Sequence, residues 1–337
     1  MNSAIVSAIA AIVAFGVTAL LGIIIVPFLH KLKFGQTIRE IGPAWHKEKN
    51  GTPTMGGIMM IIGLICACVL SFTLSGLVAT NSMWDNHKES SFVLAGIGLA
   101  IGMGLVGFLD DYIKVVKKRN LGLTAKQKTI LQLLCTVAYL SSLALSGMTT
   151  TWLPFFGDVN IVSGVGLIFW PIALLFVYGF TNAVNLTDGI DGLASTVTLV
   201  VCCGFMLASA YLNLLGTNIF ACAAAGACLG FILWNSHPAK VFMGDTGSLF
   251  LGGIVVSLAF SIGRPIILLA AGIVYLIEAF SVMLQVVYYK KTKKRLFKMA
   301  PIHHHFEMSG FSEEGIVLLF STVTAIGCFV ALIPILF

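Results

Sequence analysis

The sequence predicts an all-α polytopic membrane protein with about ten transmembrane helices. Composition, long apolar runs and the placement of Lys and Arg support this fold class. Of the 337 residues, 58% are hydrophobic and only 10% are charged, and the mean hydropathy is +0.98. A soluble domain carries about a quarter charged residues, so this chain cannot cover itself with a water-compatible surface.

Ten apolar runs are long enough to cross the hydrocarbon core, which takes about 20 helical residues. We expect them at 3–29, 54–79, 91–109, 127–148, 164–183, 191–213, 216–235, 247–262, 266–289 and 315–337. The first run has no basic residue before it and no cleavage site followed by a polar region, so we expect a retained helix and no signal peptide. No run of polar sequence is long enough for a soluble domain, and residues 1–337 are expected to form one integral-membrane domain.

The basic residues predict the orientation. All of the 20 Lys and Arg residues except Lys88 and Arg264 lie in the loops after the first, third, seventh and ninth runs or at the adjoining helix ends. Cytoplasmic loops carry the excess of basic residues, so these four loops are predicted to be cytoplasmic. Both termini then face the outer side, periplasmic or extracellular.

Acidic side chains gather on the same predicted cytoplasmic side. Only Asp85, Glu89 and Asp158 lie outward, and Glu278 alone lies deep within a run. A transporter usually binds its substrate near the membrane midplane, on broken helices. The distribution therefore favours a reaction at the cytoplasmic surface over transport.

The stretch GFLDDYIKV (107–115) ends an apolar run on two adjacent carboxylates, Asp110 and Asp111, with Lys114 close behind. Like charges make each other harder to ionise, so Mg²⁺ or the nearby lysines are expected to offset the repulsion. Consecutive helical residues diverge by about 100°, and we expect the two aspartates to do different jobs.

The stretch NAVNLTDGIDGLA (182–194) repeats a polar residue every three positions, at Asn182, Asn185, Asp188 and Asp191. The first three share one helix face if the helix extends that far. Helix capping explains a single aspartate of this set but not all four residues. The stretch is a candidate ligand-binding segment.

The stretch NSHPAKVFMGDTGS (235–248) places Asp245 between Gly244 and a TGS sequence. A carboxylate on such a loop suits Mg²⁺, which takes one or two carboxylates together with phosphate oxygens of a substrate. Capping of the eighth helix is the alternative. Phe242 offers an aromatic face to a base or a sugar ring.

The stretch PIHHHFEMSG (301–310) carries three consecutive histidines. Successive residues of a helix point in different directions, so the three cannot ligate one ion from a regular helix. We expect one or two to contact an anionic group and the others to pair with Glu307 or the backbone.

Lys49 and Thr54, in the loop GPAWHKEKNGTPTMGG (42–57), suit contacts with an anion, although basic residues beside a membrane also serve lipid headgroups. Carboxylates beside lysines, without a nucleophilic serine or cysteine motif or a Walker loop, indicate Mg²⁺-assisted phosphoryl transfer. A substrate met at the membrane surface is most simply a lipid phosphate.

Five motifs occur in a fixed order: GTPTMGG, GFLDDYIKV, NAVNLTDGIDGLA, VFMGDTGS and PIHHHFEMSG. In these the chain resembles the phospho-N-acetylmuramoyl-pentapeptide transferases, within the polyprenyl-phosphate N-acetylhexosamine-1-phosphate transferases. The resemblance implies an enzyme of the bacterial cytoplasmic membrane that transfers phospho-MurNAc-pentapeptide from UDP-MurNAc-pentapeptide to undecaprenyl phosphate, giving lipid I and UMP, with Mg²⁺. It also implies a homodimer surrounded by membrane lipid, a cytoplasmic active-site cleft, a bent ninth helix and no nucleic-acid partner.

The resemblance implies catalytic roles for Asp110, Asp111, Asp245, His303 and His304, with Asp245 as the metal ligand. It implies substrate contacts for Lys49, Asn185, Asp188, Asp191, Asn235, Phe242, Gln285 and His305, and the loop composition and the spacing above add Thr54 and Asn182 as candidate substrate-binding residues.

Three alternatives stay open at this stage. The donor could be UDP-GlcNAc instead of the muramoyl nucleotide. The chain could transport an anionic metabolite if Glu278 and Gln285 faced a water-filled path. In the transfer itself, an aspartate could deprotonate the lipid phosphate before direct attack, or could attack first and form a covalent phospho-enzyme.

Overall fold

The structure, a computed structural model, describes residues 3–31, 51–78, 82–116 and 121–336. Within them it confirms the all-α membrane fold, because ten helices are long and apolar enough to cross a membrane. These are α1 (Ser3–Lys31), α2 (Gly57–Val78), α3 (His87–Val116), α4 (Ala125–Leu145), α5 (Phe169–Thr187), α6 (Leu193–Tyr211), α7 (Leu215–Asn235), α8 (Gly244–Ser261), α10 (Ile273–Thr292) and α12 (Glu313–Leu336). The short elements are η2 (Met83–Asp85), β1 (Thr150–Leu153), β2 (Gly157–Asn160), η3 (Gly164–Ile168), η4 (Pro265–Ile267), α9 (Leu268–Ala271) and α11 (Ile302–Glu307).

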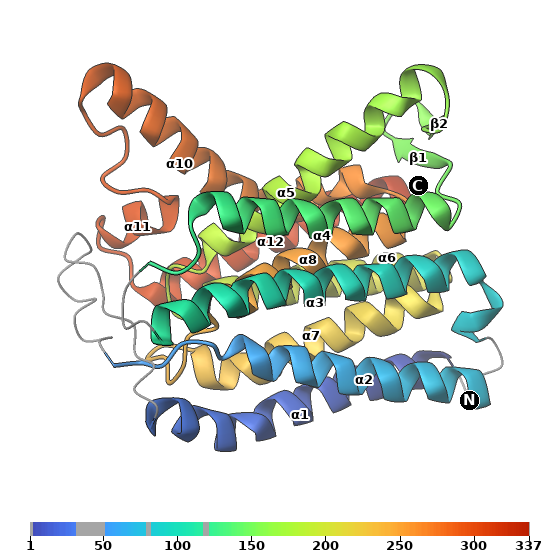
Figure 1. The fold of residues 1–337 in the computed structure, drawn as a ribbon, viewed down its shortest axis with the longest axis horizontal. Helices are drawn as coiled ribbons and strands as arrows, with labels where there is room; N and C mark the ends of the chain where they lie inside the picture. The colour runs from blue at the N-terminus through green and yellow to red at the C-terminus, as the bar shows by residue number, and fades with distance from the viewer. Residues whose placement is uncertain (1–2, 32–50, 79–81, 117–120, 337) are drawn as a thin grey trace.

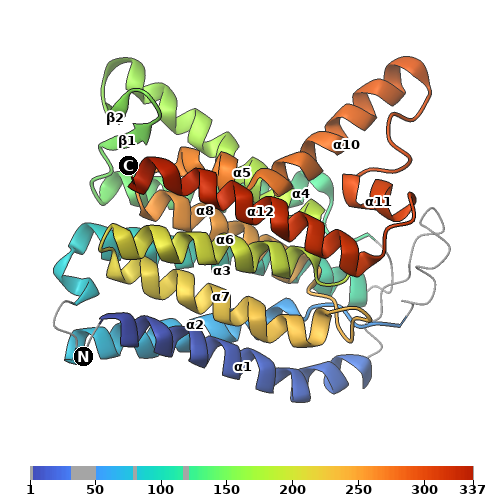
Figure 2. The same ribbon diagram turned by 180° about the vertical axis from the view of Figure 1, so that it is seen from behind.

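Most of the long helices run side by side in one bundle, and α5 and α10 lean away from it in opposite directions (Figures 1 and 2). Both ends of the chain lie at the end of the bundle that carries β1 and β2. The α10–α11 segment lies at the opposite end. The charge distribution predicts that both termini share one side, and the arrangement agrees with that part of the prediction.

Helix α8 forms the centre of the bundle. Of the 18 residues in its most apolar stretch, 94% are buried, whereas the buried share of the corresponding stretch is 22% in the α5 span and 22% in α10. Glycines let neighbouring backbones approach α8 closely: a Cβ on Gly253 would lie 2.6 Å from Ala100 Cα of α3, and one on Gly252 would lie 2.7 Å from Thr181 Cα of α5. Small residues at such crossings are typical of helix packing in membranes. They fix α3, α8 and α5 as one packed unit.

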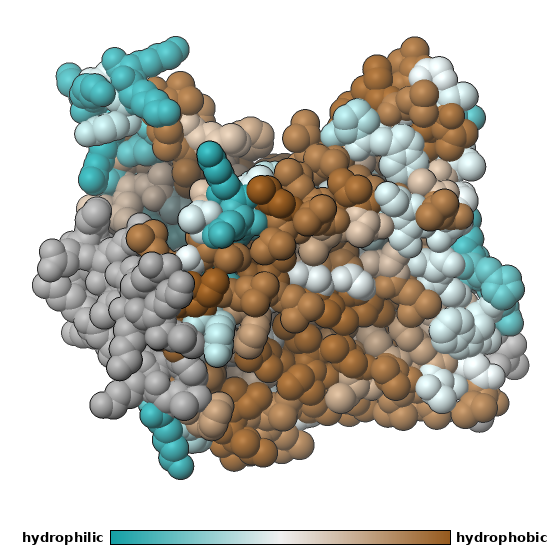
Figure 3. Space-filling model, viewed as in Figure 1, coloured by the Kyte–Doolittle hydropathy of each residue, from teal (hydrophilic) through white to brown (hydrophobic). Residues whose placement is uncertain are grey.

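The outer flank of the bundle is apolar. Figure 3 shows hydrophobic side chains across most of the visible flank and hydrophilic ones near its ends. Large side chains such as Ile12, Leu20, Leu134 and Leu318 are more than half exposed. Leaving each in water forgoes about 1.5–3 kcal/mol of burial, so this surface suits lipid.

The segment 148–164 contains a β-hairpin. Strands β1 and β2 pair antiparallel, with Thr150 opposite Asn160 and Leu153 opposite Gly157. Several of the expected boundaries were wrong. Helix α3 begins at His87 and continues to Val116 instead of spanning 91–109, which places Asp110 and Asp111 inside the helix. Helix α5 continues to Thr187 instead of ending near 183, and α8 begins at Gly244 instead of 247.

The ninth run was expected to be one span at 266–289, and the structure divides it. It begins as η4 and α9, and a new helix, α10, starts after Gly272. A Cβ on Gly272 would lie 2.9 Å from a ring carbon of Phe180 in α5, so the close approach to α5 requires glycine here. The break accounts for the bend that the resemblance implies.

Candidate active site

Three carboxylates meet where the last turns of α3 cross the first turn of α8. Asp110, Asp111 and Asp245 each offer an oxygen atom, and these atoms lie within 4.8 Å of one another. The helices touch closely there, because a Cβ on Gly107 would overlap the carbonyl oxygen of Asp245. Gly244 has a φ of 69°, a left-handed conformation that favours glycine, and a Cβ there would overlap Asp111. Asp245 lies far from Asp110 and Asp111 in the sequence, and the two glycines allow the three side chains to meet.

Two lysines neutralise most of this negative charge. The ammonium nitrogen of Lys114 lies 2.6 Å from Asp110 Oδ2 and 2.5 Å from Asp245 Oδ2. It lies 3.6 Å from Asp111 Oδ1. Lys128, from the start of α4, places its ammonium 3.1 Å from Asp245 Oδ1. Lys128 was not predicted as a site residue, because only the fold brings α4 beside α8.

The two adjacent aspartates have different partners, as predicted. Asp111 is fully buried, and its Oδ2 accepts hydrogen bonds from the backbone N–H of Thr246 at 2.9 Å and from its hydroxyl at 2.8 Å. It therefore satisfies donors in the first turn of α8, where a negative charge is also favoured by the helix dipole. Asp110 Oδ1 instead accepts from Leu123 N at 2.8 Å and fastens the chain before α4.

Asn185 joins the cluster from α5, whereas Asn182 does not. The amide nitrogen of Asn185 donates to Asp245 Oδ1 at 2.7 Å and to the hydroxyl of Ser248 at 2.9 Å. The amide of Asn182 donates to Gln132 Oε1 of α4 at 3.1 Å and to the carbonyl of Tyr178. The predicted spacing placed both on one helix, and the structure gives them different partners.

Asp188 follows the last turn of α5, and its charge is disfavoured. Although part of the residue is exposed, loss of hydration raises the pKa of its carboxyl group to about 8, and the negative charges of Asp245, Asp111 and Asp191 act in the same direction. The carboxyl group of Asp188 therefore holds its proton more tightly than an ordinary aspartic acid does.

Asp191 and Asn235 connect loops. Asp191 Oδ2 accepts from Ala239 N at 3.0 Å and lies 3.1 Å from His237 Nδ1, and the backbone N–H of Asp191 donates to Glu313. Asn235 accepts from Gly192 N at 3.1 Å and donates to the carbonyl of Val241 at 2.9 Å.

Asp191, His237 and Glu313 form a second group that brings possible metal-binding atoms within 4.8 Å of one another. The part played by His237 and Glu313 was missed, since no sequence spacing links them to Asp191.

The three histidines have three environments. His303 is fully buried, and its Nδ1 lies 3.1 Å from Glu278 Oε2, which is also fully buried. His304 Nδ1 lies 2.5 Å from Glu307, and His305 accepts from the backbone N–H of Lys298 at 3.2 Å. Contacts with Glu307 and the backbone were among the predicted ones.

The burial of Glu278 bears on the transport alternative, which required this side chain to face a water-filled path. In the structure it faces His303 with no exposed surface. Gln285 accepts from the backbone N–H groups of Leu296 and Phe297, at 3.0 and 2.9 Å, and orders the chain after α10. Neither residue lines a path of the kind that transport needs.

The first predicted loop is only partly described, and Lys49 lies outside the described residues. Thr54 is buried close to Gly244. A Cβ on Gly244 would lie 2.6 Å from the hydroxyl oxygen of Thr54. Phe242 is half-buried, and its backbone bonds to Pro53 and Gly56 hold this loop against the start of α8. The loop is therefore part of the same site.

The three-carboxylate group fits a hard divalent cation. Its donors are oxygens, which Mg²⁺ prefers. Asp111 Oδ1 and the hydroxyl of Thr54 are buried and have no hydrogen-bond partner in the described part of the chain. Buried polar atoms without partners are rare, and a bound cation gives the carboxylate oxygen one.

The fold and the acidic cluster define a membrane transferase of a known class. Residues 93–263 match the model of glycosyl transferase family 4.

The curated relatives narrow the class to one family. The chain is 46% identical over 324 residues to the phospho-N-acetylmuramoyl-pentapeptide-transferase of Clostridium perfringens strain SM101, covering 96% of this chain and 94% of that one. It is 43% identical to the enzyme of the same name from Clostridioides difficile, with 96% of each chain covered, and 44% identical to that of Bacillus licheniformis, with 92% of each covered. The chain belongs to the phospho-N-acetylmuramoyl-pentapeptide-transferase family.

The α3–α8 crossing predicts a stability difference between two glycines of α3. Gly107→Ala is expected to lower the free energy of unfolding by about 1–3 kcal/mol, because its Cβ overlaps Asp245. Gly98→Ala is the control, since nothing lies within 4 Å of its Cβ, and alanine there should raise helix stability by up to about 1 kcal/mol. Thermal unfolding of both variants in detergent measures the difference. Equal effects would contradict the close crossing.

The raised pKa of Asp188 predicts a pH dependence. The folded state binds this proton more tightly than the unfolded chain does, because an Asp in the unfolded chain has a pKa of about 3.9. The proton therefore makes its full contribution to the free energy of unfolding below about pH 3.9. It is lost as the pH rises towards about 8. Asp188→Asn should match the wild type in thermal stability at acid pH and exceed it increasingly up to about pH 8, without divalent cations. A constant difference across this range would refute the prediction.

Proposed function

We propose that the protein transfers phospho-MurNAc-pentapeptide from UDP-MurNAc-pentapeptide to undecaprenyl phosphate, forming lipid I and UMP. Family membership supports the reaction. The location of the reaction is supported by one observation, the group of three carboxylates and two lysines at one end of the central helix α8. An end of a membrane bundle is where a water-soluble nucleotide and a lipid phosphate can meet.

We propose that Asp110, Asp111 and Asp245 hold Mg²⁺. The sequence suggested Asp245 alone, and the short separations among the three carboxylates support the larger set. When bound, the ion neutralises diphosphate charge and stabilises the charge that develops on the leaving phosphate.

The lysines and the amide supply the electrostatics of the site. Lys114 and Lys128 already contact Asp245, and both ammonium groups are within reach of an anion placed among the carboxylates. Such donors stabilise phosphoryl oxygens in a site of low dielectric constant. Asn185 fixes the orientation of Asp245 by donating to its Oδ1.

The surrounding predicted residues divide into two roles. We propose that His304, His305, Asp188 and Phe242 bind the nucleotide or sugar, along with Lys49 outside the described residues. Thr54, His303 and Asn235 are buried, and we propose that they position the site instead of touching substrate. For His303 this role acts through its contact with Glu278.

We propose that the lipid phosphate attacks the β-phosphate directly. It is already anionic at neutral pH, so it needs little help from a base. Asp111 is fully buried beneath α8, and Asp110 and Asp245 are tied to Lys114, which makes each a poor nucleophile.

The protein is a multi-pass membrane protein, and its family is bacterial in the relatives described above. We propose that the carboxylate end faces the cytoplasm and that both termini face outward, as the basic residues indicate. A homodimer, which the resemblance implies, is part of the same proposal.

The reaction is tested by UMP release from UDP-MurNAc-pentapeptide and undecaprenyl phosphate. Asp245→Asn should lower the rate by at least about 10³-fold, because it removes the charge at the centre of the lysine contacts. Glu314→Gln is the matched control, an exposed acid at the same end, and should stay within about twofold. UDP-GlcNAc in place of the donor should give no UMP. Comparable turnover of UDP-GlcNAc would favour the alternative transferase.

Direct attack predicts no UMP without the lipid acceptor. In a single-turnover quench with labelled donor, enzyme and Mg²⁺ alone, we expect neither UMP nor labelled protein. Adding undecaprenyl phosphate should release UMP in proportion to enzyme. Stoichiometric UMP together with labelled protein before that addition would establish the covalent route instead.

A further inference from the structure

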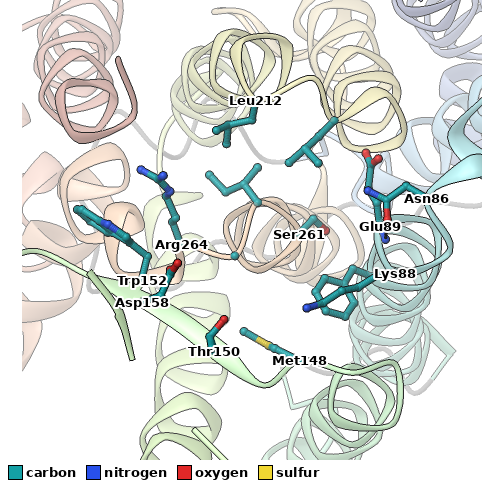
Figure 4. Close-up of a pocket in the computed structure, with 14 residues that line it drawn as sticks. Asn86, Lys88, Glu89, Met148, Thr150, Trp152, Asp158, Leu212, Ser261 and Arg264 are labelled. Atoms are coloured by element: carbon teal, nitrogen blue, oxygen red, sulfur yellow. Dashed lines mark hydrogen bonds between the residues drawn. The ribbon is translucent and has the colours of Figure 1, made fainter. Parts of the chain in front are cut away.

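A second polar site lies at the other end of the bundle. A pocket of about 330 Å³ opens there, lined by residues from α3, β1, β2, the end of α8 and the loops that follow η2, α4, α6 and α8 (Figure 4). Ser261, the last residue of α8, lies in its wall, whereas Asp245 lies in the first turn. Helix α8 has 18 residues, so its ends are about 27 Å apart. The pocket is therefore separate from the carboxylate cluster.

Two opposite charges face each other across this pocket. Figure 4 places Lys88 on one side and Asp158 on the other, with Thr150 and Ser261 between them. Lys88 and Arg264 are the two basic residues that stand apart from the predicted cytoplasmic loops, and both line it. The pocket thus collects charge at the end of the molecule where charge is scarce.

The other two charged side chains of the lining are already engaged. Glu89 accepts from the backbone N–H and the hydroxyl of Thr217, at 2.9 and 3.2 Å. Arg264 donates to the carbonyl of Pro334 at 2.6 Å and lies over the ring of Trp152. Lys88 and Asp158 are exposed, and within the described parts of the chain neither forms an ion pair, although the Lys88 ammonium lies 5.7 Å from the centre of the Phe92 ring. Their charges are available to a ligand.

Ser261 supplies an independent sign of a missing partner. It is only 5% exposed, and its hydroxyl makes no hydrogen bond to any described residue. A buried hydroxyl without a partner costs about 1–3 kcal/mol. A polar ligand group in the pocket would satisfy it.

We propose that this pocket binds a small zwitterion, with a primary ammonium group at Asp158 and a phosphate or carboxylate at Lys88 and Ser261. The lining carries two basic and two acidic side chains, so a simple anion would meet Glu89 and Asp158 and a simple cation would meet Lys88 and Arg264. The apolar part of the lining, which includes Phe92 and Met148, covers the short carbon linker between the two groups. Both a phosphoethanolamine lipid headgroup and a free zwitterion have this chemistry.

The first experiment measures binding to the full chain in phosphatidylglycerol nanodiscs by titration calorimetry. O-phosphoethanolamine is the probe, with inorganic phosphate and ethanolamine as its separate halves. We expect the zwitterion to bind at least about tenfold more tightly than either half, since each half leaves one charge without a partner. Binding of phosphate equal to that of the zwitterion, or no binding at millimolar probe, would overturn the proposal.

Variants assign the binding to this pocket. Lys88→Gln, Asp158→Asn and Ser261→Ala should each weaken phosphoethanolamine binding, by about tenfold for the charges and about threefold or more for the hydroxyl. Ser261→Ala removes a group without a partner, so the fold should persist. Ser71→Ala is the matched control, because it removes a buried, unpartnered hydroxyl from α2 away from the pocket. Equal weakening by Ser71→Ala, or unchanged binding in all three pocket variants, would refute the assignment.

Native mass spectrometry of the protein released from nanodiscs that contain phosphatidylethanolamine distinguishes a lipid headgroup from a free zwitterion as the ligand. An adduct retained by the wild type and lost in Ser261→Ala identifies the lipid headgroup. Calorimetric binding of the free probe without a lipid adduct identifies a soluble zwitterion. Absence of both signals contradicts the site altogether.

Discussion

The crossing of α3 and α8 is the contact on which the candidate active site depends. It brings three carboxylates together in a bundle that is otherwise apolar, an arrangement that is costly unless cations offset it. Lys114 bridges Asp110 and Asp245 across the crossing, and Asp111 bonds to the first turn of α8. The same contacts therefore pack the two helices and assemble the chemistry.

Helix α8 separates two polar ends with different character. At one end, carboxylates and lysines pair with one another and leave oxygen atoms for a hard cation. At the other end, the charges of Lys88 and Asp158 stay apart and face a pocket. Between these ends α8 is almost wholly buried against other helices. Its length sets the distance between the two polar ends, and its middle exposes no polar surface that connects them. This is the organisation of a surface-acting enzyme, and the buried pair of Glu278 and His303 agrees with it.

The sequence was enough to predict the ten spans and the divergence of Asp110 and Asp111 towards different hydrogen-bond partners, because hydropathy and helical geometry are local properties. It could not predict contacts that depend on how the helices pack. Lys128 reaches Asp245 only because α4 lies beside the cluster, and Asn182 turns to Gln132 for the same reason. The break at Gly272, where a Cβ would crowd the carbonyl of Leu268 and a ring of α5, has no local sign beyond the glycine itself. The group of Asp191, His237 and Glu313 joins three distant segments.

The central claim is that the carboxylates at the α3–α8 crossing form the cation site. Anomalous scattering from crystals of the full chain grown with Mn²⁺, a divalent cation with similar oxygen ligands, locates the ion directly. We predict a peak among the carboxylates of Asp110, Asp111 and Asp245. A peak at Asp191, His237 and Glu313, with none at the crossing, would contradict this account.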